Sequence, residues 1–346
     1  MKRTISVLLI VFLLPFVLSL SPTVYDPNYV AKYQSPEGIQ FLSYTHTWNK
    51  EKLENLYKEL LRNQHGPELN TLREVRIKGE TNPTKTGDYN PATNVITLYD
   101  GDAQNTIESM RRVLSHEYGH HFAFYYVPQH VLPISTKWKT LRGAEDTFSL
   151  SFWNYSTEGN HKWFTPEIFA EDYVMLYGST RKVSNEDIAN GTVFQHMVKH
   201  ENEYLPNVLE DIPLQRYVEK VSGLQVDTKR IIKVPQFVGL KNNIITFEIM
   251  KRENILYRFS FDYYEGNKKV QTPENWVHRG SYAFTSTPDT NGRISINLED
   301  TLLEEQKDTF TGSVQITVEA VDLNTNLGLK KDLFSLKYGA DKKFTK

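Results

Sequence analysis

The stretch His116-Glu117-Tyr118-Gly119-His120 decides what fold and chemistry to expect of this chain. It is an HExxH motif inside a run, Asn105 to Tyr126, that reads as a helix. Two histidines four residues apart lie about 40° apart around a helix axis, so both imidazoles can bind one metal ion. Glu117 is offset beside them, where it can accept a proton from water instead of binding the metal. The motif therefore predicts a hydrolytic zinc site with one zinc ion per chain.

The residues around the motif favour a helix. Asn105 can cap its start, and Glu108 follows three residues later, as in a capping box. Pro128 is expected to end it. Before the motif, apolar residues recur at helical spacing and predict a buried face, namely Ile107, Met110, Val113 and Leu114.

A second helix downstream is expected to supply the third zinc ligand, because catalytic zinc usually takes three protein ligands. Thr165 reads as the N-cap of this helix and Pro166 as its first residue. Glu167 and Glu171 are four residues apart and share a face. One carboxylate can bind the metal, and the other can accept the free N–H of a ligating histidine. We assign Glu167 as the ligand and Glu171 as the histidine's partner; the reverse assignment, and Asp172 in place of Glu171, stay open.

The two motifs together resemble those of a known family. HEYGHH, followed some tens of residues later by E-x-F-A-E, is similar to the glutamate-zincin metallopeptidases. Within them, the resemblance is greatest to the group that contains anthrax lethal factor and the secreted Pro-Pro endopeptidases. It covers about residues 90–180. It implies that Glu167 is the third zinc ligand and that Glu117 is the general base.

The resemblance also implies a tyrosine, shortly before the ligand glutamate, that helps to stabilise the oxyanion. Tyr155 is further from Glu167 than the family pattern, and Asn160 stands nearer the expected place. His161 is the alternative donor. The candidates for this role are therefore Tyr155 and His161.

The first residues predict secretion. Lys2 and Arg3 precede the apolar run 7–18, and small residues follow up to Ser21, so residues 1–21 read as a signal peptide. Twelve apolar residues with a proline among them are too few to span a membrane comfortably. We expect no stable membrane span after cleavage, with an uncleaved N-terminal anchor as the alternative. The chain has no cysteine, which suits an extracellular bacterial protein without disulfides.

Composition argues against a nucleic-acid-binding protein. The chain has 346 residues and a net charge of −2, so no basic excess is present to neutralise phosphates. Its 39% hydrophobic content is enough for one or two substantial cores.

The pattern of secondary structure predicts two domains. Residues 22–232 are dominated by helical patterns, with strands expected at Leu72–Ile77 and Asn94–Tyr99 before the HExxH helix. We interpret this part as an α+β zincin-like catalytic domain. An edge strand is expected to border the cleft, and if Val95–Tyr99 is that edge, an extended peptide can pair with it as an added strand.

From about Val234 the pattern changes to period two, and residues 233–346 are expected to form an all-β immunoglobulin-like or fibronectin-like sandwich. This sandwich is expected to act as a spacer or to contact a cell surface, and packing against the catalytic domain is the alternative. The strands expected are Asn243–Met250, Ile255–Tyr264, Arg293–Leu298, Ser313–Val321 and Asp332–Tyr338.

The sequence thus predicts a secreted zinc metalloendopeptidase. It would hydrolyse peptide bonds of a protein or peptide substrate with a zinc-activated water and Glu117 as general base. One alternative is a secreted surface-binding module whose zincin domain is degenerate and whose metal is structural. The presence of Glu117 argues against this, because a structural site needs no base. A zinc hydrolase of a non-peptide amide is a third possibility.

Overall fold

The computed structural model describes a mixed α+β protein with three sheets among its described residues. The chain divides into two compact units, with the boundary between Pro128 and Gln129. The domain boundary predicted near residue 232 falls within the second unit, and the assignment of 22–232 and 233–346 to separate domains stays a prediction. The predicted signal peptide, residues 1–21, lies outside the described residues, which are 27–132, 134–144, 161–266, 268–269, 281–285, 292–302 and 310–346.

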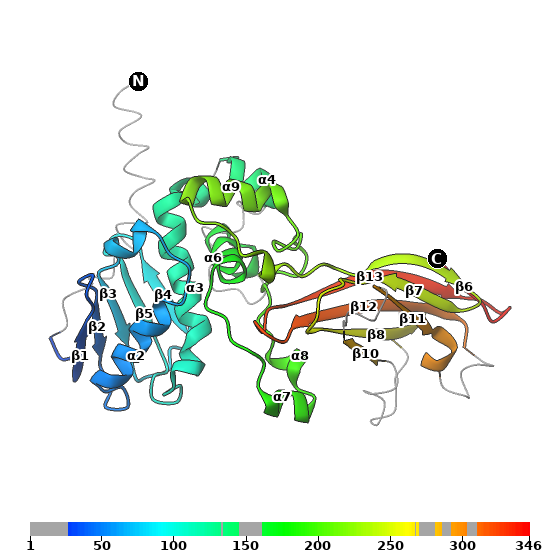
Figure 1. Cartoon of the computed structure of the whole chain (residues 1–346), viewed down its shortest axis with the longest axis horizontal. Helices are drawn as coiled ribbons and strands as arrows, with labels where there is room; N and C mark the ends of the chain where they lie inside the picture. Colours follow the sequence, from blue (N-terminus) through cyan, green and yellow to red (C-terminus); the bar gives the residue numbers. More distant parts are fainter. Residues whose placement is uncertain are drawn as a thin grey trace, which may run out of the picture. The chain divides into compact units, whose positions relative to one another are not determined.

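A five-stranded mixed sheet, in the order β1-β2-β3-β5-β4, forms the core of the first unit (Figure 1). β2, β3 and β5 are parallel neighbours, and β1 and β4 pair antiparallel at the two edges. All four residues of β5 are buried, as expected for an inner strand of such a sheet. The strands are β1 (Ala31–Gln34), β2 (Gln40–Ser43), β3 (Glu74–Ile77), β4 (Gly87–Asn90) and β5 (Val95–Leu98).

The expectation that Val95–Tyr99 is the edge strand is wrong. β5 pairs with β3 on one side and with β4 on the other, so the edge is β4. The sequence of β4 is Gly-Asp-Tyr-Asn, and three of these four residue types are depleted in strands. The composition of this segment therefore does not predict a strand.

The helices of the first unit are α2 (Lys50–Leu60), the short 3₁₀ helix η1 (Pro67–Thr71) and α3 (Ile107–Tyr126), which carries the HExxH motif. The predicted cap of α3 is wrong by one residue. Thr106 is the N-cap and forms a reciprocal capping box with Ser109, whose N–H donates to the Thr106 hydroxyl at 3.1 Å. Glu108 instead pairs with Arg111 one turn further on, at 3.0 Å.

A fully buried carboxylate, Glu68 of η1, anchors α3. It accepts hydrogen bonds from the hydroxyls of Tyr118 (2.8 Å) and Tyr126 (2.7 Å), both on α3, and from the N–H of Gly66 (2.9 Å). His121 Nε2 lies 2.8 Å from the Glu68 carbonyl oxygen, and because a carbonyl can only accept, Nε2 carries the proton. Burial lowers the pKa of His121, which favours the neutral ring. Three of these hydrogen bonds come from α3, namely from Tyr118 and His121, in and next to the HExxH motif, and from Tyr126 at the end of the helix.

The second unit begins with a group of helices around the buried helix α6 (Thr165–Leu176). Phe164, not Thr165 as predicted, is the N-cap of α6, and Pro166 stands in its first turn. Among the described residues, no helix combines the length and apolarity needed to cross a membrane. The other helical segments are η2 (Pro128–Val131), α4 (Lys137–Arg142), η4 (His161–Trp163), α7 (Asn185–Asn190), α8 (Val193–His196), α9 (Ile212–Ser222) and η5 (Thr228–Arg230).

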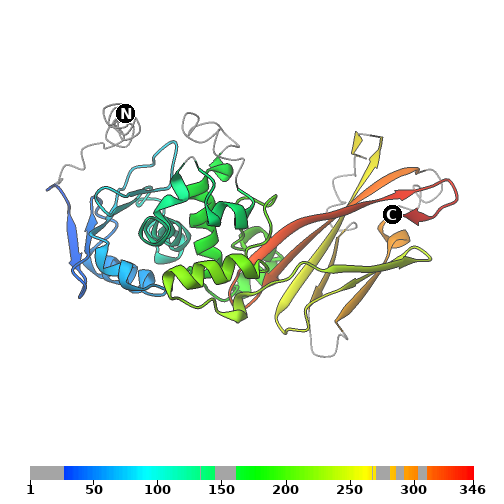
Figure 2. The same ribbon diagram turned by 90° about the horizontal axis from the view of Figure 1, so that it is seen from above.

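Two antiparallel sheets follow in the second unit (Figure 2). One has the order β10-β8-β12-β13-β14, with β9 also paired to β8, and the other has the order β11-β7-β6. Phe247 of the smaller sheet contacts Phe259 of the larger one, with ring centroids 4.7 Å apart, so apolar faces of the two sheets pack together. The strands are β6 (Gln236–Lys241), β7 (Ile244–Glu248), β8 (Ile255–Glu265), β9 (Lys268–Lys269), β10 (Ser281–Thr285), β11 (Arg293–Asn297), β12 (Gly312–Asp322), β13 (Gly328–Tyr338) and β14 (Phe344–Thr345).

Replacing the buried anchor is expected to destabilise the protein. In Glu68→Ala, two tyrosine hydroxyls and the Gly66 N–H lose their acceptor, and the free energy of unfolding should fall by about 3 kcal/mol. Denaturation in urea measures this loss. Glu54→Ala is the matched control, because the Glu54 side chain is 41% exposed and forms a surface ion pair with Lys58 one turn away on α2, at 2.8 Å. Equal unfolding midpoints for the two variants would contradict the anchoring role of Glu68.

Candidate metal centre

Two imidazoles and one carboxylate come together in the structure. His116 and His120 lie one turn apart on α3 with ring centroids 4.9 Å apart. One nitrogen of each histidine and one carboxylate oxygen of Glu167 all lie within 4.8 Å of one another. His120 and Glu167 are buried, and His116 is half-buried. These are the three residues that the sequence motifs assign as ligands, and their role in binding a metal stays a prediction.

The donor set of this cluster fits zinc. Two imidazole nitrogens with one glutamate oxygen form one of the ligand sets that catalytic zinc sites use, and they leave a fourth position for water. Thiolate ligation is excluded because the chain has no cysteine. Magnesium and calcium prefer sites made of oxygen ligands, so two imidazoles argue against them.

Glu117 is held against the edge strand β4. Its side chain is only 5% exposed, although it stands beside the two histidines on α3. A Cβ atom on Gly87 would lie 2.4 Å from Glu117 Oε1 and 2.7 Å from Val113 Cγ1, both far inside normal contact distance. Only glycine therefore lets the backbone of β4 come this close to α3. The backbone of β4 at Gly87 therefore limits the positions that the Glu117 carboxylate can adopt.

The other acidic residues of α6 are buried as well. Glu171 Oε2 accepts a hydrogen bond from the backbone N–H of Glu201 at 3.0 Å. Its predicted contact with a ligating histidine stays a prediction. Asp172, the alternative partner for that histidine, forms a buried ion pair with Arg142 at 3.0 Å and lies 3.4 Å from His200 Nε2. Glu171 is thus hydrogen-bonded, whereas Asp172 has an ion-pair partner but its two oxygens accept no hydrogen bond from the described residues.

His161 is the oxyanion candidate that the structure describes, and Tyr155 lies outside the described residues. The Nε2 atom of His161 lies 3.3 Å from Glu167 Oε2, and its Nδ1 atom lies 3.0 Å from Glu201 Oε2. The side chain is 48% exposed. His161 thus bridges two carboxylates, one of which belongs to the ligand cluster, and its role as an oxyanion donor stays a prediction.

Sequence reasoning missed three residues near this centre: Gly87, Glu201 and Tyr99. Burial raises the pKa of the Tyr99 phenol; Lys85 opposes this shift, and nearby carboxylates, Glu117 among them, add to it. The neutral form of Tyr99 is therefore favoured, and the residue lies within the electrostatic reach of Glu117. None of the three belongs to a motif, and their positions in the sequence do not predict that they lie near the HExxH residues or Glu167.

Comparison with known proteins adds little to this picture. A family model described only as ":-like" matches residues 46–135, roughly a quarter of the chain, and this description names no activity. The matched part includes the HExxH motif and ends before Glu167. No curated protein and no solved structure matches the chain. The comparisons therefore name no activity for this chain.

Removing one ligand is expected to abolish tight zinc binding. His120→Ala leaves two of the three donors, and zinc affinity should fall at least about 100-fold. Competition with a chromophoric zinc chelator measures this affinity. His46→Ala is the control, since His46 is exposed and lies outside the cluster. Unchanged zinc affinity in His120→Ala would contradict the assignment of His120 as a ligand.

Proposed function

We propose that this protein is a secreted zinc metalloendopeptidase of the glutamate-zincin type. The observation that supports this most is the cluster of His116, His120 and Glu167 donor atoms within 4.8 Å, with the buried Glu117 on the same helix as the two histidines. A structural zinc site has no use for a fourth, proton-accepting residue beside its ligands. The presence of Glu117 therefore favours hydrolysis over a purely structural metal.

His116, His120 and Glu167 would hold one zinc ion. Zinc in this position would supply Lewis acidity, which lowers the pKa of water and polarises a carbonyl group. Glu171 would keep the α6 end of the site in place through its hydrogen bond with the Glu201 N–H. His161, whose Nε2 lies 3.3 Å from Glu167 Oε2, and Tyr155 are the two proposed donors of a hydrogen bond to a substrate oxygen.

Glu117 would transfer the proton. Its carboxylate would accept a proton from the attacking water and pass it to the leaving amine. The backbone of β4 at Gly87 would limit the positions open to this carboxylate and so favour a geometry suitable for transfer. Its burial excludes most solvent, which strengthens the electrostatic interactions of the carboxylate.

The edge strand β4 supports a peptide substrate. Among the described residues, β4 pairs only with β5, so its outer edge can add an extended peptide as a further strand. The same strand contacts Glu117 through Gly87. A peptide paired with β4 would therefore have its backbone held close to the proton-accepting group. This supports cleavage of extended protein or peptide substrates rather than of small amides.

The remaining predictions concern the surroundings of the catalytic part. We propose that the two antiparallel sheets after residue 233 form an immunoglobulin-like sandwich that contacts a cell surface. The proposed secretion rests on the signal peptide read from residues 1–21. The net charge of −2 supports protein rather than nucleic acid as the partner.

Replacing the proton acceptor is expected to separate metal binding from catalysis. Glu117→Gln keeps the size of the side chain and removes its basicity, so kcat should fall by about 10²–10⁴-fold while zinc stays bound. Cleavage of a fluorescently labelled unstructured protein, beside zinc content, measures both effects. Glu108→Gln, an exposed glutamate in the first turn of the same helix, is the control. Wild-type activity in Glu117→Gln would rule out Glu117 as the base.

Adding one methyl group to β4 tests whether the backbone at Gly87 positions the Glu117 carboxylate. In Gly87→Ala the new methyl group would need the space of the Glu117 carboxylate, and kcat should fall at least about 10-fold with zinc retained. Gly239→Ala on β6 is the control, because a Cβ there meets nothing within 4 Å. If both variants turn over the same labelled substrate equally fast, the contact between β4 and Glu117 does not matter for catalysis.

A further inference from the structure

Residues 198–204, named the brace here, connect two parts of the second unit and contain no helix or extended strand. On one side the brace contacts α6. The backbone N–H of Glu201 donates to Glu171 Oε2 at 3.0 Å, and His200 Nε2 lies 3.4 Å from Asp172 Oδ1. Both carboxylates are buried, so each depends on the polar partners given to it inside the protein.

The brace also contacts the 3₁₀ turn that leads into α6. Asn202 Nδ2 donates to the carbonyl oxygen of Lys162 at 2.9 Å. Glu201 Oε2 lies 3.0 Å from His161 Nδ1, and the opposite nitrogen of that ring lies 3.3 Å from Glu167 Oε2. The brace therefore reaches the carboxylate of the proposed ligand through a single imidazole ring.

On its other side the brace pairs with the turn between β12 and β13. Val198 forms an isolated parallel bridge with Leu327, in which the Val198 N–H donates to the carbonyl of Asn326 (2.8 Å) and the Gly328 N–H donates to the carbonyl of Val198 (2.7 Å). The Asn326 side chain adds a third bond, from Nδ2 to the carbonyl of His196 at 3.0 Å. The β12–β13 turn is thus bound to both the brace and the residues just before it.

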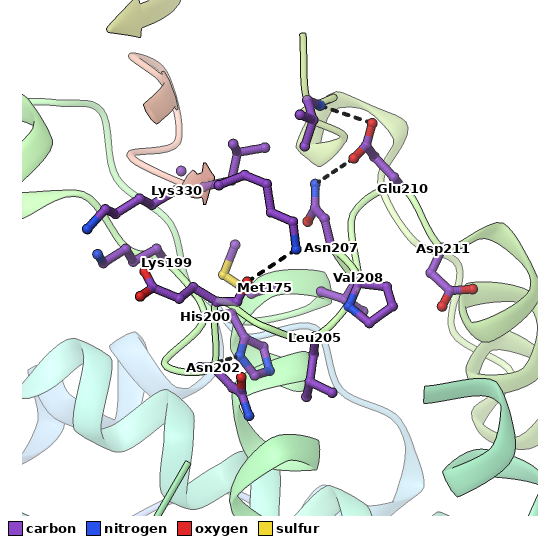
Figure 3. A pocket seen from close by; sticks show the side chains of 16 residues that line it. Met175, Lys199, His200, Asn202, Leu205, Asn207, Val208, Glu210, Asp211 and Lys330 are labelled. Atoms are coloured by element: carbon purple, nitrogen blue, oxygen red, sulfur yellow. Dashed lines mark hydrogen bonds between the residues drawn. The ribbon is translucent and has the colours of Figure 1, made fainter. Parts of the chain in front are cut away.

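A second tie runs from β13 itself. Lys331 Nζ donates to the carbonyl oxygen of Glu203 at 3.4 Å, and both residues line a cavity of about 360 Å³, which Figure 3 shows. His200 and Asn202 of the brace line the same cavity, and Figure 3 shows their side chains there. On this face the brace thus borders a cavity, and polar contacts tie it at its two sides. The loss of the contacts on one side should therefore disturb those on the other.

From this arrangement we propose that the β12–β13 turn acts through the brace as a positioning element for Glu167 and Glu171 on α6. The C-terminal sheets would then be part of the metal site's support rather than a separate spacer. This inference rests on the proposed metal site. Residues that orient metal ligands from outside typically change metal affinity 10–100-fold when they are removed.

Asn326 offers the sharpest test because its side chain can be removed with little harm to the fold. Its φ is +57°, in the left-handed region that glycine adopts freely, so Asn326→Gly keeps the turn. Asn326 Oδ1 is buried and has no hydrogen-bond partner among the described residues, so the variant also removes an unpaired acceptor. Asn254→Gly is the matched control: Asn254 also has a positive φ (67°), precedes β8 and is exposed.

The experiment measures zinc affinity of the full chain by chelator competition, the visible spectrum of the cobalt-substituted protein, and kcat and KM on a labelled unstructured substrate. Asn326→Gly should weaken zinc binding about 10-fold and alter the cobalt spectrum, with an unchanged circular dichroism spectrum. Asn254→Gly should match the wild type in all three measurements.

A second pair of variants tests the brace directly. Glu201→Ala should weaken zinc binding, and Glu201→Gln, which keeps an acceptor facing His161, should restore most of it. If the wild type binds zinc and both Asn326→Gly and Glu201→Ala bind it as tightly, the positioning role is wrong and the proposed peptidase stands. If the wild type binds no zinc, the proposed function and this inference both fail.

Discussion

The buried carboxylate of Glu68 is the constraint on which the geometry of the proposed site depends. An HExxH motif can bind a metal only if its helix keeps one rotation about its own axis, and at 100° per residue Tyr118 lies about 160° around that axis from His120. Glu68 accepts hydrogen bonds from Tyr118 and Tyr126, and His121 donates to its carbonyl. The anchor therefore holds the helix from the side opposite the two imidazoles. Because these groups are buried, rotating the helix would leave several of them without partners.

The edge strand β4 adds a second constraint on the same helix. Gly87 brings backbone against Glu117, so the carboxylate is confined by a part of the chain that a side chain cannot replace without a clash. The strand that confines the Glu117 carboxylate is also an edge strand, to which an extended peptide would add in the proposed function. Substrate register and base position would thus be set by one element.

The sequence predicted the local features of the site well, because they follow from helical periodicity. HExxH at 116–120 and the glutamates of 165–173 lie on helices, where spacing determines which residues share a face. The long strands β8 and β12 were expected for the same kind of reason, since their burial alternates with period two. Contacts between segments that are distant in the sequence leave no periodic pattern, and these contacts were not predicted.

Three kinds of feature had no signal in the sequence. β4 contains turn-forming residues and becomes a strand only through its pairing with β5. The position of Gly87 against Glu117 is a tertiary contact between segments thirty residues apart. The brace has no regular structure, and its contacts join residues near 165, 200 and 326.

The measurement that tests the central claim most directly is the zinc content of the purified protein, beside cleavage of an unstructured protein with and without a chelator. One zinc per chain with chelator-sensitive cleavage is the predicted result, and a protein that binds no zinc would contradict the account.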